Sequence, residues 1–163
     1  MIDFLEKEAA VEDERWMKYA LKEAERAFES GEVPVGAVVV YENRIIGRGH
    51  NQTEGLKDPT AHAEIVAIGA AASYLNSWRL SDCSVYVTLE PCAMCAGAIV
   101  LSRLNRLIFG PHDPKAGACG SLMNIVQDGR LNHQVSITSE VLADECTALL
   151  KSFFHKIRKE DTF

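Results

Sequence analysis

Residues 83–110 read CSVYVTLEPCAMCAGAIVLSRLNRLIFG, and the fold class follows largely from this segment. Apolar residues at 83–89 run up to a proline, which predicts a strand followed by a helix from about 92 to 104. A second apolar run at 106–110 predicts another strand. Strands that alternate with helices are typical of an α/β fold whose parallel strands are joined by helices.

The flanking sequence extends the same architecture. Apolar residues at helical spacing predict an amphipathic helix over 13–29 that ends at Gly31. The runs VGAVVVY and IIGRGHN flank a short polar connection near 42–44, and this pattern is typical of a β-hairpin. Three further elements complete the prediction: a helix over 61–75 with Thr60 as its N-cap, a short strand near 134–138, and a closing helix over 139–159.

Length and composition are those of an ordinary soluble protein. Of 163 residues, 47% are hydrophobic and 25% charged, so we expect one domain over 1–163, with an acidic N-terminal extension at 1–13. The apolar stretches are too short to span a bilayer as a helix, and the first residues are acidic where a signal peptide is basic. The five cysteines, an odd number, argue against a secreted disulfide framework. We therefore expect a cytoplasmic protein.

The net charge of −6 is unevenly distributed. Residues 1–14 contain six acidic residues against one lysine, a balance of −5, which leaves −1 for the rest of the chain. A local basic surface can bind phosphates even in an acidic protein, although such residues also occur on solvated helix faces. The basic residues gather in two places: Arg103, Arg106 and Lys115 near the centre, and Lys151, Lys156, Arg158 and Lys159 near the end.

Cys92 and Cys95 follow Pro91 with the spacing C-x-x-C, which is compatible with three kinds of site. A redox pair of this spacing usually follows the first strand of a thioredoxin-like domain, whereas this pair follows the third predicted strand. A structural zinc site usually takes four ligands from two such pairs, and the other cysteines of the chain are isolated in sequence. A catalytic metal site needs only one further ligand and a base.

The segment TAHAEIVAI supplies both of these groups. His62 and Glu64 fall at the start of their predicted helix, as Cys92 and Cys95 do at theirs. Helices that follow strands of an open α/β sheet begin at one edge of the sheet, where such folds bind ligands. The sequence therefore predicts His62, Cys92 and Cys95 as zinc ligands, with the fourth position of the metal left for water. Glu64 is the predicted general acid and base.

H-x-E followed by P-C-x-x-C is a signature of zinc deaminases in which the glutamate is not a metal ligand. The chain resembles the cytidine deaminase superfamily and, within it, the bacterial tRNA-specific adenosine deaminases. This resemblance implies a three-layer α/β/α cytidine-deaminase-like fold with a mixed five-stranded sheet. It extends from about residue 14 to residue 158 and rests on VPVGAVVV, GHNQ, DPTAHAEI, YVTLEPCAMCAGAI, DPKAGACGSL, LNH and LADECTALLKSFF.

The resemblance also implies an activity: hydrolytic deamination of adenosine to inosine at the wobble position of a tRNA anticodon, by a homodimer with one zinc ion per subunit. Zinc-bound hydroxide then attacks the amidine carbon while Glu64 shuttles protons. Asn51 matches the family asparagine that contacts the flipped nucleotide, and its amide offers donors and an acceptor to a purine edge. Four further residues match positions near the anticodon loop: Asp113, Lys115, Asn132 and Phe154.

Some alternatives remain open at this point. Phe154 is suited to stacking on an unpaired base, but it is equally compatible with a helix core beside Phe153. A deaminase of a free base or nucleoside, such as guanine or cytosine, would carry the same zinc motif. A non-catalytic zinc module that binds RNA would most simply lack the acid and base, and Glu64 is present in this chain.

Overall fold

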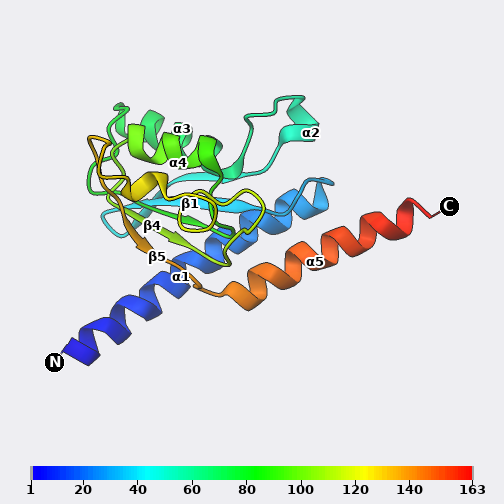
Figure 1. The fold of residues 1–163 in the computed structure, drawn as a ribbon, viewed down its shortest axis with the longest axis horizontal. Helices are drawn as coiled ribbons and strands as arrows, with labels where there is room; N and C mark the ends of the chain where they lie inside the picture. Colours follow the sequence, from blue (N-terminus) through cyan, green and yellow to red (C-terminus); the bar gives the residue numbers. More distant parts are fainter. Residues whose placement is uncertain (1, 163) are drawn as a thin grey trace.

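The computed structural model describes residues 2–162 and contains a mixed five-stranded sheet in the order β2-β1-β3-β4-β5 (Figure 1). Strand β1 runs antiparallel to both β2 and β3, whereas β3, β4 and β5 are parallel to one another. This topology confirms the predicted fold class and the β-hairpin at its edge. The strands are β1 (Gly36–Tyr41), β2 (Arg44–His50), β3 (Ser84–Val87), β4 (Arg106–Phe109) and β5 (Ser136–Thr138).

Helices cover both faces of the sheet and make three layers (Figure 1). Helix α1 packs against β1, β2 and β3, whereas α3 packs against the other face of the same strands with α4 beside it. The helices are α1 (Ile2–Glu29), α2 (Thr53–Leu56), α3 (Ala63–Leu75), α4 (Ala93–Leu101) and α5 (Ala143–Glu160), with a short 3₁₀ helix, η1 (Ile125–Gln127).

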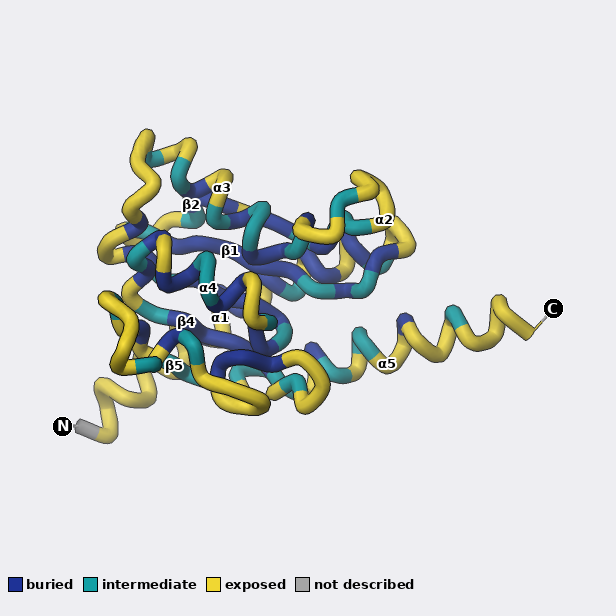
Figure 2. Tube along the Cα trace, turned by 45° about the horizontal axis from the view of Figure 1, so that its top comes forward, coloured by how far each residue is buried: buried dark blue, intermediate teal, exposed yellow. Residues whose placement is uncertain are grey.

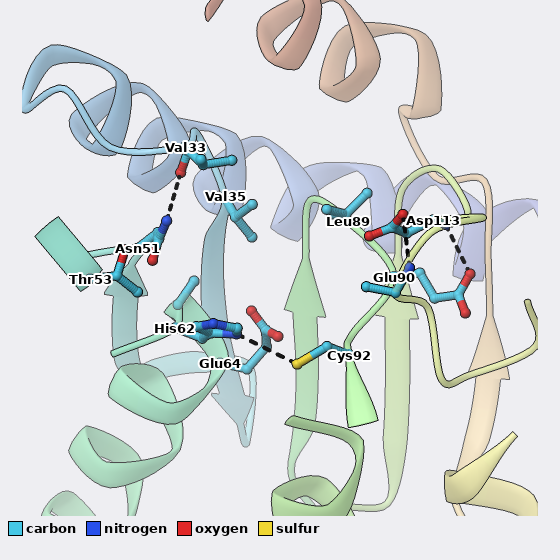
Figure 3. Close-up of a pocket in the computed structure, with 12 residues that line it drawn as sticks. Val33, Val35, Asn51, Thr53, His62, Glu64, Leu89, Glu90, Cys92 and Asp113 are labelled. Carbon is cyan, nitrogen blue, oxygen red and sulfur yellow. Dashed lines mark hydrogen bonds between the residues drawn. The ribbon is translucent and has the colours of Figure 1, made fainter. Parts of the chain in front are cut away.

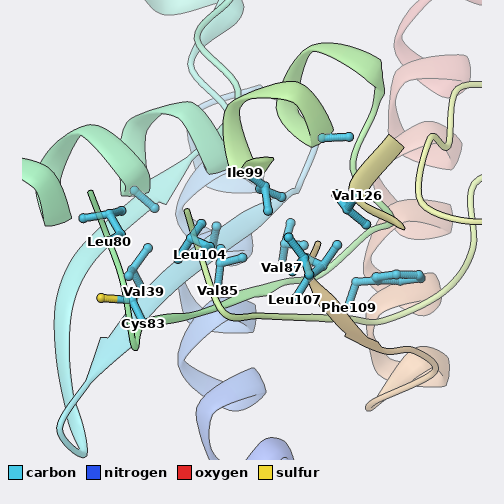
Figure 4. Packing of buried hydrophobic residues seen from close by; sticks show 14 of the residues in the cluster. Val39, Leu80, Cys83, Val85, Val87, Ile99, Leu104, Leu107, Phe109 and Val126 are labelled. Atoms are coloured by element: carbon cyan, nitrogen blue, oxygen red, sulfur yellow. The ribbon is translucent and has the colours of Figure 1, made fainter. Parts of the chain in front are cut away.

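The larger apolar core lies between the sheet and the α3–α4 layer (Figure 4). Val85 and Val87 of β3 and Leu107 of β4 meet Ile99 of α4 there, all fully buried. The strands are apolar on both faces because each face is covered by a helix layer. Burying a side chain of this size stabilises a fold by about 1.5–3 kcal/mol. Because several such side chains join α3 and α4 to the sheet, the two helices are held in fixed positions on it.

Two glycines of β2 allow α3 to approach the sheet closely. A Cβ at Gly47 or at Gly49 would collide with the backbone of α3, near Ala67 in both cases. Alanines at every fourth position of α3 complete this close packing: Ala63, Ala67 and Ala71 are all fully buried. The small residues therefore determine the height of α3 above the sheet, and with it the position of the residues at its start.

The second core lies between the sheet and α1, and it includes an ion pair. Asp13 is buried and accepts hydrogen bonds from the hydroxyl of Tyr86 at 2.9 Å and from Arg106 Nη2 at 2.9 Å. Arg106 is only half-buried, but its charge is paired with Asp13, so it is not a free charge of the basic surface that the sequence suggested.

Several predicted helix boundaries differ from the structure. The helix predicted over 13–29 already begins at Ile2, so the acidic residues before Asp13 belong to α1, and its exposed start projects from the body (Figure 2). An ion pair of 2.7 Å between Lys7 and Asp3, one turn apart, supports this projecting part. The closing helix, predicted from 139, begins at Ala143. Thr60 is not the N-cap of α3, because its hydroxyl and backbone N–H both donate to Asp58 Oδ1.

Among the described residues, no helix is both long enough and apolar enough to cross a membrane.

Candidate metal centre and its cavity

The site forms where two helices begin at one edge of the sheet. His62 is the N-cap residue of α3, and Cys92 is the N-cap residue of α4. Cys95 lies one turn into α4, on the face that the C-x-x-C spacing places beside Cys92. The prediction that both helix starts lie together at one edge is therefore confirmed.

The three predicted ligands converge in the structure. His62 Nδ1 lies 3.6 Å from Cys92 Sγ and 3.5 Å from Cys95 Sγ, and all three ligand atoms lie within 4.8 Å of one another. In a zinc tetrahedron with ordinary Zn–S and Zn–N bonds, neighbouring ligand atoms are about 3.5–3.8 Å apart. The spacing and the donor types of this cluster therefore fit a zinc ion.

The three side chains of the cluster shift one another's pKa values. Hydrogen bonds from Cys95 and His62 lower the pKa of the Cys92 thiol to about 3. The hydrogen bond to Cys92 raises the pKa of His62 above its ordinary value, and the same thiol pairing and burial raise that of Cys95. The three groups share protons that metal binding would displace, because a metal binds the thiolate and the neutral imidazole.

No second thiol pair completes a closed site. Within the part of the chain that the structure describes, Cys83, Cys119 and Cys146 lie outside the ligand cluster. Cys119 packs in the glycine-rich loop, with its Sγ 3.9 Å from the carbonyl of Pro91. The described residues thus supply three candidate ligands here, a number typical of catalytic rather than structural zinc sites.

Glu64 lies in the first turn of α3, two residues after the histidine ligand. Its side chain is 4% exposed and borders the cavity beside the ligand cluster (Figure 3). Burial raises the pKa of this carboxyl above its ordinary value, the direction that favours the protonated form which a general acid needs.

A cavity of about 330 Å³ opens above the cluster (Figure 3). Its size is at the lower end of small-molecule sites, and its surface is mostly apolar with a few polar groups, as in such sites generally. The lining residues come from both sides of the sheet edge: Val33, Val35, Asn51, Thr53, His62, Ala63, Glu64, Leu89, Glu90, Cys92, Asp113 and Ala116.

Asn51, predicted to contact the substrate, lies on the cavity wall opposite Cys92 (Figure 3). Its Nδ2 donates a hydrogen bond of 3.4 Å to the carbonyl of Val33, which fixes the direction of the amide. Its Oδ1 is buried and has no hydrogen-bond partner. A buried acceptor without a partner costs about 1–3 kcal/mol, so this oxygen is suited to receiving a donor from a ligand.

The other predicted contact residues are more scattered. Asp113 lines the cavity, and Lys115 is exposed two residues further along the same loop. Asn132 is exposed in the loop before β5 and does not line the cavity. Phe154 on α5 is 45% exposed, whereas its neighbour Phe153 is buried, so Phe154 is not a core residue.

Sequence reasoning missed two buried carboxylates that hold the walls of the cavity. Glu32 accepts hydrogen bonds from the backbone N–H groups of Glu54 and Gly55, and thereby holds α2 and Thr53 against the cavity. Glu90 does the same for the loop that carries Asp113. Glu90 could have been identified from the sequence, because it is a charged residue beside a proline at the end of an apolar strand.

Comparisons with known proteins agree with this geometry. The family model described as MafB19-like deaminase matches residues 11–158. The tRNA-specific adenosine deaminase of Bacillus subtilis is 50% identical over 149 residues, which cover 91% of this chain and 92% of that protein.

Two solved structures share the fold. One, from studies of A-to-I editing by tRNA:A34 deaminases at the wobble position of transfer RNA, has a TM-score of 0.80 at 42% identity and covers 83% of this chain and 98% of its own. The other, guanine deaminase from Nitrosomonas europaea, has a TM-score of 0.74 at 25% identity and covers 86% of this chain and 83% of its own. With its fold, its ligand cluster and these relatives, the chain belongs to the family of tRNA-specific adenosine deaminases.

Proposed function

We propose that this protein hydrolyses adenosine to inosine at the wobble position of a tRNA anticodon and releases ammonia. The observation that carries the proposal is the convergence of His62, Cys92 and Cys95 beside the buried Glu64 at a cavity with an open mouth. The family relationship supports RNA as the substrate, because the relative at 50% identity is a tRNA-specific adenosine deaminase.

The cofactor in this proposal is one zinc ion, held by His62, Cys92 and Cys95. The two thiols and one imidazole are soft and borderline donors that zinc prefers over magnesium or calcium. When bound, zinc supplies Lewis acidity, which lowers the pKa of water from about 15.7 to about 7 and so makes a nucleophile available at neutral pH.

Glu64 moves the protons in this mechanism. Its carboxylate takes a proton from the attacking water and delivers it to N1 of the adenine ring as C6 becomes tetrahedral. It then takes the proton of the new C6 hydroxyl and passes it to the amino group, which leaves as ammonia while the C6 carbonyl of inosine forms. A positioned acid and base of this kind contributes about 10²- to 10⁴-fold to the rate.

The chain's other residues bind and orient the base. We assign the unpartnered Oδ1 of Asn51 to a donor group of the flipped nucleotide. An anticodon loop already presents unpaired bases, so bringing one into the cavity costs less than from a duplex. Asp113, Lys115, Asn132 and Phe154 are the proposed contacts to the rest of the loop, with Phe154 exposed for stacking.

We further propose that the protein acts as a homodimer in the cytoplasm. Met94 and Leu101 lie two turns apart on α4, and both side chains are exposed, Leu101 at 70%. Large apolar side chains on one exposed helix face are typical of a surface that another subunit covers. A cytoplasmic location follows from the proposed substrate.

Mass spectrometry of an anticodon stem-loop tests the activity. Incubation with the zinc-loaded protein is expected to increase the RNA mass by about one dalton at a single adenosine, as an amino group becomes a carbonyl. A folded, zinc-loaded Glu64→Ala variant is the control and is expected to be inactive. Turnover of free guanine or cytidine, without any change in the RNA, would instead identify a free-base or nucleoside deaminase.

A further inference from the structure

Glu90 lies two residues before the first cysteine ligand, and its side chain is fully buried. Figure 3 shows this side chain directed towards the Asp113 loop and away from His62. It is not part of the ligand cluster and makes no hydrogen bond to it among the described residues. Neither metal binding nor proton transfer in the proposed mechanism therefore uses this carboxylate.

All the hydrogen bonds that Glu90 accepts come from a single loop. Backbone N–H groups donate from Asp113 at 3.0 Å, Cys119 at 3.0 Å and Ser121 at 3.1 Å. The hydroxyl of Ser121 also donates, and His112 Nδ1 lies 2.9 Å from Glu90 Oε1. A carboxylate offers about four lone-pair positions, so the acceptor capacity of Glu90 is saturated by this loop.

The loop has no regular secondary structure, and its other hydrogen bonds are local turns and a link from Ala118 to the carbonyl of Pro91. Residues 111–124 contain no helix and no strand, only isolated bridges such as that between Cys92 and Gly117. Gly117 is required by this arrangement, because a Cβ there would overlap the Glu90 carboxylate and the carbonyl of Asp113. The carboxylate therefore acts as the centre around which the loop folds.

This loop forms one wall of the cavity and its rim. Asp113 and Ala116 line the cavity, and Lys115 between them is exposed where a phosphate could bind. Loss of the hydrogen bonds to Glu90 is expected to loosen this wall at Asp113 and Ser121, whereas the loop stays joined to Pro91 and Cys92 through Ala118 and Gly117. The distance between the RNA-facing residues and the metal centre thus depends on Glu90.

We propose that Glu90 is a positioning residue that holds the loop 112–121 as the RNA-binding wall of the cavity and so sets the affinity for the anticodon loop. The proposal rests on the proposed tRNA deaminase function. It predicts that substrate binding and chemistry respond differently to the loss of this carboxylate.

The test compares Glu90→Gln with a matched control, Asp13→Asn. In Glu90→Gln, an amide NH₂ faces N–H donors in place of an acceptor. We expect KM for an anticodon stem-loop to rise about tenfold to a hundredfold, with kcat changed by less than about threefold and zinc content unchanged. Asp13 is also a buried carboxylate that accepts several hydrogen bonds, but it lies on the α1 side of the sheet. Its variant is expected to lower Tm without changing KM.

A second measurement reports the loop itself. In Glu90→Gln, the amide protons of Asp113, Cys119 and Ser121 are expected to exchange with solvent faster than in the wild type, whereas in Asp13→Asn they are not. If the wild type deaminates no anticodon stem-loop, the proposed function fails, and this exchange measurement alone decides whether Glu90 holds the loop. Unchanged exchange at these amides overturns the proposal.

Two kinetic outcomes also overturn it. One is a folded Glu90→Gln variant with unchanged KM; the other is a loss of kcat at unchanged KM, which would assign Glu90 to the chemistry. If Glu90→Gln does not fold, Ser121→Ala decides, because it removes one side-chain donor and leaves the backbone donors in place. A KM raised about twofold to fivefold in Ser121→Ala supports the proposal, and an unchanged KM contradicts it.

Discussion

At the scale of single residues, the cavity wall contains a buried acceptor that has no hydrogen-bond partner. Among the described residues, Asn51 Oδ1 is the buried side-chain nitrogen or oxygen that has no partner. Native proteins satisfy most such atoms, so an unsatisfied one in a cavity marks a position where ligand binding has been favoured over stability. If Asn51 binds the substrate as proposed, its unpaired oxygen should lower the free energy of unfolding of the free protein.

Asn51→Ala should separate activity from stability. We expect kcat/KM for the stem-loop to fall about tenfold to a hundredfold, because a hydrogen bond to the substrate is lost. The free energy of unfolding should stay the same or rise, because the variant no longer buries an unpaired oxygen. Chemical denaturation and steady-state kinetics measure the two effects.

Gln52→Ala is the control for this pair of measurements. Gln52 is the next residue in the chain, bonds to His50 and does not line the cavity. Its variant is expected to leave kcat/KM within about twofold of the wild type. A clear loss of stability in Asn51→Ala, with activity retained, would show that this asparagine is structural.

At the scale of elements, the height of α3 above β2 determines the position of the candidate ligand His62 and of Glu64 at its start. Gly49 lies against the α3 backbone near Ala63, the first residue of the helix. The chain can approach so closely only because neither residue has a larger side chain. A change of packing at this contact is therefore expected to reach His62.

Gly49→Ala should destabilise the fold and weaken metal binding together. The added methyl has to displace backbone, so we expect a loss of at least about 1–3 kcal/mol in the free energy of unfolding. Zinc affinity, measured by competition with a chelator, should fall as α3 shifts. Gly69→Ala on the exposed side of α3 is the control, since its Cβ meets nothing within 4 Å and should stabilise the helix by about 0.5–1 kcal/mol. Equal effects of the two variants would contradict the packing argument.

Helix α5 is anchored by a buried thiol whose titration should appear in the pH dependence of stability. Burial raises the pKa of Cys146 from 9.0 to about 12. Because the unfolded chain releases this proton more readily, the associated stability is fully present below about pH 9 and is lost as pH rises towards 12.

We expect the free energy of unfolding to fall more steeply between pH 9 and pH 11 in the wild type than in Cys146→Ala. Each fully developed proton difference contributes up to about 1.4 kcal/mol per pH unit. Val126→Ala, a buried residue that does not titrate, should lose stability at neutral pH and keep the steep alkaline slope. Identical slopes in the wild type and Cys146→Ala would rule out this thiol as a source.

The elements also show what the sequence could and could not predict. The hairpin, the alternation of strands with α3 and α4, and the ligand cluster follow from local patterns, because period and spacing are local properties. The start of α1 was missed because its acidic residues resemble a solvated extension, yet charge alone does not prevent a helix. The shape of the loop 112–121 depends on hydrogen bonds to Glu90, more than twenty positions earlier, so no local pattern contains it.

At the scale of the whole molecule, two exposed helix ends of opposite charge project in opposite directions (Figures 1 and 2). The start of α1 carries most of the net negative charge, whereas residues 151–161 at the end of α5 carry four basic residues against Glu160 and Asp161, a balance of +2. Separation of charge along the longest axis orients a polyanion towards the basic end before contact. RNA is therefore expected to approach from the side of α5.

Subunit association can be tested on the exposed face of α4. If the proposed dimer forms through α4, Leu101→Lys is expected to convert it into a monomer in sedimentation velocity, because a charge would be buried without a partner at the interface. Val11→Lys is the matched control: Val11 is 68% exposed on the projecting start of α1, and its variant should remain dimeric. The opposite result, in which Val11→Lys is monomeric and Leu101→Lys is still dimeric, would place the interface on α1 instead.

The helix starts that hold the candidate ligands have one further consequence. His62 and Cys92 occupy the N-cap positions of α3 and α4, and neither makes a side-chain capping hydrogen bond. The usual caps, which contribute about 1 kcal/mol each, have been given up for residues suited to a cation. In the proposed zinc form, folding and metal loading are one linked equilibrium, since the ion would reinforce the contacts that His62 already makes with Cys92 and Cys95 between the two helix starts. On this proposal a cell short of zinc would lose the protein to proteolysis as well as to inactivity, so its abundance would follow metal supply.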